Sequence, residues 1–165
     1  MALFRPLAAL LLFALAACTT TAGEPRAPSW FVMRHLQKGQ GQDPGLSAEG
    51  AGNAEKLASW FEPEDWPAAI YVSTTRRARE TAAPLAARLG LTPKEYDPGD
   101  TAGLLARVRA EAGTVLIVGH SNTVPEIVAG LGGARPADLA DSDYGDIFRV
   151  RRDGTVERLR LGAAR

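Results

Sequence analysis

Three short runs of continuous apolar residues constrain the fold of this chain more than any other feature. The runs are Trp30–Met33, Ala69–Val72 and Val115–Val118. Such runs are typical of strands that are buried on both faces of a parallel sheet. Because helical patterns separate them, the sequence predicts an α/β domain, a three-layer sandwich with a mostly parallel central sheet and helices on both faces.

Four stretches have helical periodicity. They are residues 47–61, 75–89, 101–110 and 122–131. Ser47 is expected to cap the first helix and Gly90 to end the second, in which Pro84 predicts a kink. Ser121 or Asn122 is expected to cap the fourth. Near the C-terminus, an Asp-Gly pair between two strand-like segments predicts a β-hairpin over residues 147–161.

The N-terminal residues have the pattern of an exported protein. Residues 1–17 combine a short basic start with an apolar run, as secretory signal peptides do. Leu15-Ala16-Ala17-Cys18 resembles the lipobox of bacterial lipoproteins, which implies that Cys18 is acylated. Residues 18–29 then form the lipidated cysteine and a tether, and residues 30–165 form one domain. The alternative is an ordinary signal peptide with an incidental cysteine.

The residue after the cysteine bears on location. Thr19 stands where some bacteria place an Asp to retain a lipoprotein in the inner membrane. By this resemblance, the sequence predicts a lipid-anchored protein of the bacterial cell envelope, on the periplasmic face of the outer membrane. Attachment would come from the N-terminal lipid alone.

Composition excludes several classes of function. The 19 Lys and Arg residues balance 19 Asp and Glu residues, so the formal net charge is zero and gives no global attraction to nucleic acid. One cysteine and two histidines are too few for a structural zinc site. We therefore predict no metal, no cofactor and no nucleic-acid partner.

Polar and basic residues follow each predicted strand. They are Arg34-His35 after the first, Ser73 to Arg77 after the second, and Gly119 to Asn122 after the third. Since the carboxyl ends of parallel strands meet at one edge of a sheet, both histidines of the chain and several arginines should lie together. Such a cationic cluster suits a phosphoryl group, which the N-terminus of the fourth helix would also favour.

Four segments together resemble the histidine phosphatase superfamily, the phosphoglycerate-mutase-like group. They are Met33-Arg34-His35, Leu46 to Gly50, Ser73 to Thr81, and Val118 to Thr123. The resemblance runs from about residue 30 to 161. The compact length is most similar to small bacterial members related to phosphohistidine phosphatases.

The resemblance implies a role for each matching residue. His35 would be the nucleophile that becomes phosphorylated, and Arg34 and Arg77 would hold the phosphoryl oxygens. The family pattern places its pocket arginine directly before the Ala of Arg-Ala-x-x-Thr, which selects Arg77 over Arg76. His120 would be the second imidazole, hydrogen-bonded to the phosphoryl group.

Other positions carry less specific expectations. Ser121, beside His120, is predicted to contribute to phosphate binding. The family usually has Gly or Ala where this chain has Leu36, whose side chain is expected to narrow the pocket or form an apolar wall. For the general acid we favour Asp97 over its neighbours Glu95 and Asp100, although ordinary turn chemistry also explains an Asp-Pro-Gly sequence. His120 or water are the other possible proton donors.

The loop after the nucleophile, residues 38–45, is either a mobile lid or a plain connection. The sequence as a whole predicts a phosphatase that hydrolyses a phosphate monoester or phosphoramidate, in a phosphorylated small molecule or a phosphoprotein. The alternatives are a phosphomutase and a catalytically weak phospholigand-binding lipoprotein.

Overall fold

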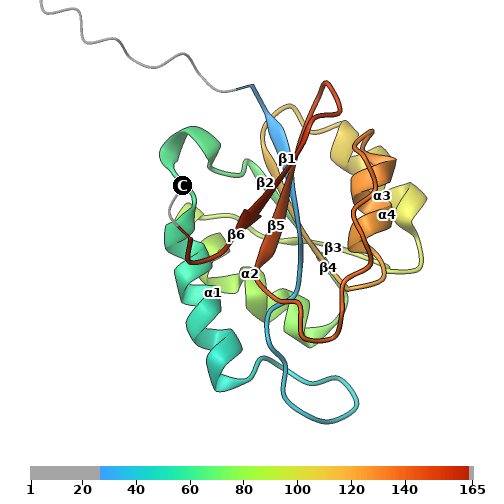
Figure 1. Ribbon diagram of the computed structural model, residues 1–165. Helices are drawn as coiled ribbons and strands as arrows, with labels where there is room; N and C mark the ends of the chain where they lie inside the picture. The colour runs from blue at the N-terminus through green and yellow to red at the C-terminus, as the bar shows by residue number, and fades with distance from the viewer. Residues whose placement is uncertain (1–26, 164–165) are drawn as a thin grey trace, which may run out of the picture.

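The computed structural model describes residues 27–163, and its centre is a six-stranded sheet between two layers of helices (Figure 1). The strands are β1 (Ser29–Arg34), β2 (Ala69–Ser73), β3 (Lys94–Tyr96), β4 (Val115–Gly119), β5 (Asp146–Arg151) and β6 (Val156–Arg160). The helices are α1 (Ala48–Trp60), α2 (Arg76–Leu89), α3 (Thr101–Arg109) and α4 (Val124–Gly130), with a 3₁₀ turn, η1, at Pro63–Asp65.

The strand order is β3-β2-β4-β1-β5-β6. Strands β1 to β4 are parallel, whereas β5 pairs antiparallel with β1 and forms the C-terminal hairpin with β6. The predicted three-layer fold and the hairpin are confirmed.

Two hydrophobic cores explain the continuous apolar runs. Phe31 and Met33 of β1 pack in the core under α1 and α2, whereas Trp30 and Val32 pack in the core under α3 and α4. Successive strand residues point to opposite faces. The middle residues of the central strands are therefore apolar because both faces of the sheet are covered.

The helix ends agree with the sequence except in α4. Ser47 Oγ accepts a hydrogen bond from the Gly50 amide, and α2 ends at Gly90, whose φ of 65° is the left-handed conformation that glycine adopts readily. The predicted cap at Ser121 or Asn122 is wrong. The amides of Thr123 and Val124 both donate to the His120 carbonyl, which closes a turn and delays the helix to Val124.

The predicted signal peptide, Cys18 and most of the tether lie outside the described residues. Ser29, the last residue of the predicted tether, is the first residue of β1. No helix within residues 27–163 combines the length and apolarity needed to cross a membrane.

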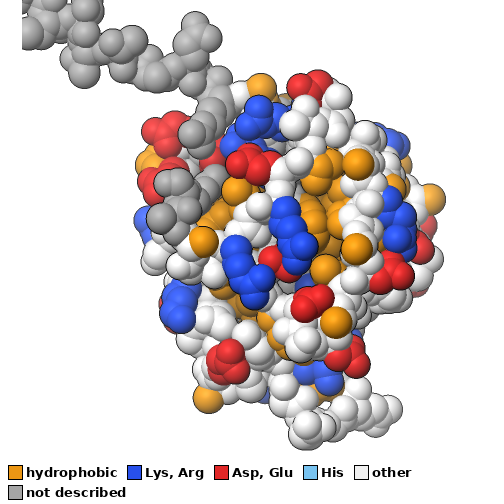
Figure 2. Space-filling view, viewed as in Figure 1, with side chains coloured by type: hydrophobic (Ala, Val, Ile, Leu, Met, Phe, Trp, Pro, Cys, Tyr) orange, Lys and Arg blue, Asp and Glu red, His pale blue; other side chains and the backbone are white. Residues whose placement is uncertain are grey.

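The surface carries charges of both signs. Figure 2 shows basic and acidic side chains mixed with apolar ones over the face that carries β5 and β6.

Candidate active site

The register of the sheet places the two histidines side by side. Arg34 of β1 pairs with Gly119 of β4, and the His35 amide continues this pairing with a 2.9 Å hydrogen bond to the Gly119 carbonyl. The next residue after Gly119 is His120. The centroids of the two imidazole rings are therefore 5.3 Å apart. As predicted, the two histidines lie together at the carboxyl edge of the sheet.

The backbone holds the ring of His35 in one tautomer. His35 Nδ1 lies 2.8 Å from the Leu36 carbonyl oxygen. Because a carbonyl oxygen can only accept, Nδ1 carries the proton and Nε2 keeps its lone pair. Burial is the main cause that lowers the pKa of His35 to about 4, and the nearby positive charge of Arg77 lowers it further. A neutral imidazole with a free Nε2 can act as a nucleophile.

The side chain of Leu36 does not line the pocket as expected. It is fully buried in the core beneath α1 and α2. Its amide donates to Thr81 Oγ1, and that hydroxyl donates to the Arg77 carbonyl. The Thr of the Arg-Ala-x-x-Thr segment thus ties the end of β1 to the first turn of α2.

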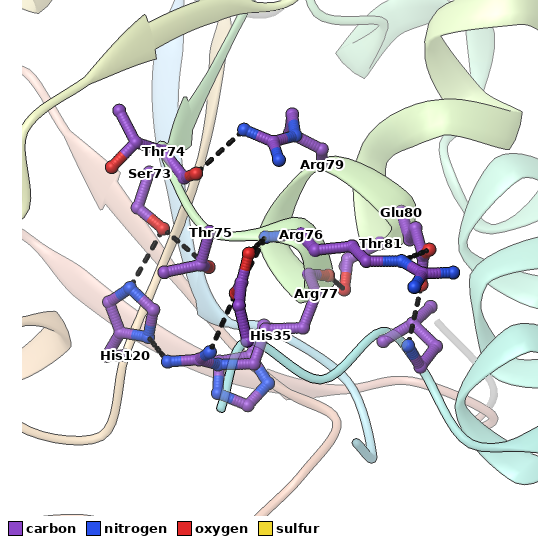
Figure 3. Close-up of polar contacts among 12 residues, drawn as sticks. His35, Ser73, Thr74, Thr75, Arg76, Arg77, Arg79, Glu80, Thr81 and His120 are labelled. Atoms are coloured by element: carbon purple, nitrogen blue, oxygen red, sulfur yellow. Dashed lines mark hydrogen bonds and ion pairs between the residues drawn. The ribbon is translucent and has the colours of Figure 1, made fainter. Parts of the chain in front are cut away.

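The two adjacent arginines at the start of α2 point in different directions (Figure 3). Arg77 is largely buried, and its Nη2 lies 3.4 Å from His120 Nδ1. Arg76 is mostly exposed and forms a 2.6 Å ion pair with Glu80. Arg77 Nε is buried and has no hydrogen-bond partner among the described residues. Of the pair, Arg77 is the one that the structure brings to the histidines, as the motif indicates.

The guanidinium of Arg34 binds mainly to the loop over residues 140–144, which the sequence analysis did not identify as part of the site. Its Nη1 donates to the carbonyls of Ala140, Asp141 and Asp143 at 2.7, 3.1 and 3.2 Å. The Tyr144 ring stacks 4.2 Å from the guanidinium carbon. Arg34 Nε is buried and has no hydrogen-bond partner among the described residues.

Both ring nitrogens of His120 have polar neighbours. Nδ1 faces Arg77, and Nε2 lies 2.8 Å from Ser73 Oγ at the end of β2. Burial is the main cause that lowers the pKa of His120 to about 4, with Arg77 and Arg34 adding to it. His120 is therefore neutral near pH 7.

Two predicted site residues are not joined to this cluster. Asp97 is exposed, and its carboxylate accepts from the Gly99 amide within a turn. No contact of the described residues links it to either histidine. Ser121 is half-buried, and the structure gives no hydrogen bond for its hydroxyl.

A different carboxylate lies beside the cluster. Asp43, on the loop after the nucleophile, is 3.6 Å from Arg77 Nη1 and accepts from the Arg76 amide. Isolated in a Gly- and Gln-rich stretch, Asp43 gave no signal in the sequence. Within residues 27–163, no three His, Cys, Asp or Glu side chains are grouped to hold a metal ion.

Comparison with known proteins gives a family match over part of the chain and a shared fold. Residues 29–99 match the model of the histidine phosphatase superfamily, branch 1. No curated protein matches the chain.

Three solved structures share the fold. The protein histidine phosphatase SixA complexed with tungstate is 21% identical, with a TM-score of 0.58 over 79% of this chain and 94% of that one. A structure described as mycobacterial hydrolase 1 is 19% identical, with a TM-score of 0.62 over 85% of this chain and 100% of that one. The mycobacterial glucosyl-3-phosphoglycerate phosphatase in complex with inorganic phosphate is 17% identical, with a TM-score of 0.59 over 84% and 98%. From β1 to just after β3, residues 29–99 are thus similar to the histidine phosphatase superfamily, and the described chain shares the fold of these three structures.

Proposed function

We propose that the protein is a metal-independent phosphatase that acts through a phosphohistidine on His35. One observation carries the proposal. Two neutral imidazoles lie 5.3 Å apart beside Arg34 and Arg77, whose buried Nε atoms have no acceptor within the described chain. A phosphoryl group supplies acceptors for both nitrogens and offsets their charge.

The reaction has two steps. Nε2 of His35 attacks phosphorus in line and the N–P bond forms, while the bond from phosphorus to the leaving group breaks and the leaving group departs with the electron pair and takes a proton from water. Water then attacks the phosphorus, the N–P bond breaks, and inorganic phosphate leaves. Arg34 and Arg77 stabilise the charge on the phosphoryl oxygens, which is the main requirement of phosphoryl transfer.

Two kinds of substrate fit this site, a phosphate monoester and a phosphoramidate such as phosphohistidine. The exposed position of Asp97 favours the phosphoramidate, because its nitrogen leaving group depends less on a carboxylic acid nearby. SixA and glucosyl-3-phosphoglycerate phosphatase act on one class each by their names, and both share the fold.

The test is phosphate release from p-nitrophenyl phosphate and from a phosphohistidine peptide. We expect turnover of both, faster with the peptide, and none after His35→Ala. Binding of phosphate without turnover would identify a phospholigand-binding protein instead. Turnover only when an acceptor hydroxyl is supplied would identify a phosphomutase.

We also propose that the lipid on Cys18 anchors the protein in the bacterial envelope, at the outer membrane. Support comes from the lipobox-like Leu15-Ala16-Ala17-Cys18 alone. In a detergent phase separation of cells that express the full chain, the protein should enter the detergent phase, and Cys18→Ser should leave it in the aqueous phase. Equal partition of the two proteins would reject the anchor.

A further inference from the structure

The contacts of His120 determine where its proton lies. Arg77 Nη2 faces Nδ1 at 3.4 Å. A guanidinium can only donate, so a proton on Nδ1 would set two donors against each other. Since His120 is neutral, its one proton belongs on Nε2, which then donates to Ser73 Oγ across 2.8 Å.

Ser73 is placed to hold that bond. It is fully buried at the end of β2, so water does not compete for its hydroxyl. Its Oγ also lies 3.1 Å from Thr75 Oγ1. A serine hydroxyl donates one proton and accepts at its lone pairs. It can therefore accept from His120 and donate to Thr75 at the same time, as the chain of contacts in Figure 3 requires.

The backbone of His120 is fixed independently of this bond. Its amide donates to Thr123 Oγ1, and its carbonyl accepts from the amides of Thr123 and Val124. These bonds set the position of the backbone but leave the ring free to turn. The Ser73 hydroxyl is the neighbour that selects one ring orientation with Nδ1 toward Arg77.

We propose that Ser73 is a positioning residue that fixes His120 as the Nε2–H tautomer and turns its unprotonated Nδ1 toward the phosphoryl site. His35 then has the opposite tautomer, with its proton on Nδ1. The inference deepens the proposed function and rests on it for the role of the ring. In the second step, His120 Nδ1 accepts a hydrogen bond from the attacking water, whose proton passes to a phosphoryl oxygen while the N–P bond of His35 breaks.

Nitrogen-15 NMR of the histidine rings tests the tautomers directly. The chain has two histidines, so full-length protein labelled with ¹⁵N-histidine gives two ring systems, which His120→Asn assigns. At pH 7 we expect His35 to be protonated on Nδ1 and His120 on Nε2. This measurement on the unsubstituted protein requires neither turnover nor a change at Ser73.

Substitution of Ser73 tests the cause. Ser73→Ala should shift the His120 ring toward a mixture of tautomers and leave the His35 signals unchanged, which is the internal control for folding. It should also lower kcat by about tenfold, the value of one such hydrogen bond, with little change in KM. Ser73→Thr keeps the hydroxyl and should restore both the spectrum and most of kcat.

Two results would overturn the proposal. They are a His120 ring protonated on Nδ1 in the unsubstituted protein, and a His120 spectrum that Ser73→Ala leaves unchanged. A protein with the expected spectra but no turnover would retain the assignment of Ser73 and refute the proposed function.

Discussion

Adjacent residues on a helix point about 100° apart, and at the start of α2 this separates Arg77 from Arg76. Arg77→Ala should lower kcat by about 10²- to 10³-fold, because it removes a preorganised donor to the phosphoryl group. Arg76→Ala is the matched control. It deletes an exposed ion pair with Glu80 and should change kcat less than about threefold. Equal losses in the two variants would contradict the assignment.

The two histidines make stability depend on pH. Their folded pKa values, about 4, lie below the ordinary value near 6.5, so between these pH values the unfolded chain binds more protons. Stability is therefore highest above pH 6.5 and falls as the pH drops toward 4, by at most about 1.4 kcal/mol per pH unit for each histidine.

Thermal melts over this range test the dependence. The melting temperature of the unsubstituted protein should fall between pH 6.5 and 4. The melting temperature of the double variant His35→Asn, His120→Asn should fall less. Activity should persist down to about pH 4, where Nε2 of His35 becomes protonated. If the melting temperatures of the two proteins fell equally as the pH drops, groups other than the histidines would control the loss of stability at acid pH.

The sequence predicts some site residues and not others for a physical reason. His35 and His120 follow buried strands directly, so sheet geometry alone brings them together. Tyr144 reaches the site from a loop with no strand or motif beside it. Leu36 was misplaced because a residue next to the nucleophile was expected at the pocket, whereas its side chain turns into the core.

At the scale of elements, α1 depends on one glycine for its close approach to the chain after the nucleophile. A Cβ on Gly50 would lie 2.0 Å from the Gln37 carbonyl oxygen, whereas a Cβ on Gly52 would have no atom within 4 Å. Gly50→Ala must therefore shift α1 or the backbone that follows His35, and it should cost at least about 2 kcal/mol. Gly52→Ala should stabilise the protein by up to about 1 kcal/mol. Urea unfolding of both variants measures the difference, and similar values for the two would refute the packing.

The loop after the nucleophile is closed at its base and attached to α2. Lys38 and Leu46 form an antiparallel bridge, and the Leu46 amide donates to Glu80. The Asp43 carboxylate of this loop lies 3.6 Å from Arg77 Nη1, where we propose that phosphate binds. The structure thus favours a fastened connection over a free lid.

Asp43→Asn removes this negative charge. We expect it to tighten inhibition by inorganic phosphate by about two- to fivefold, the range for a partly exposed ion pair. Asp138→Asn, which breaks an exposed pair with Arg135, is the control and should have no effect. Weaker inhibition in Asp43→Asn would mean that the carboxylate supports the site instead.

The boundaries of most elements were predictable because caps and glycines mark them. The start of α4 was not, because the His120 carbonyl takes the amides that a capping side chain would have bound. The same bonds leave the start of α4 with fewer free amides to offer a phosphate than the sequence suggested.

At the scale of the whole molecule, the fold separates stability from chemistry. One core covers each face of the central strands. The candidate site residues follow the carboxyl ends of those strands. A buried ion pair between Arg149 and Asp65 lies outside this cluster. Substitutions in the cluster should therefore change turnover more than folding.

The proposed reaction depends on transfer of the phosphoryl group to His35. Rapid quench of the full-length protein with a ³²P-labelled phosphate ester, followed by digestion and mass spectrometry at neutral to alkaline pH, measures this directly. We predict that the peptide carrying His35 becomes labelled at least as fast as phosphate is released. His35→Ala should abolish this label. Turnover that persists in His35→Ala, or label on the peptide that carries His120, would contradict the mechanism.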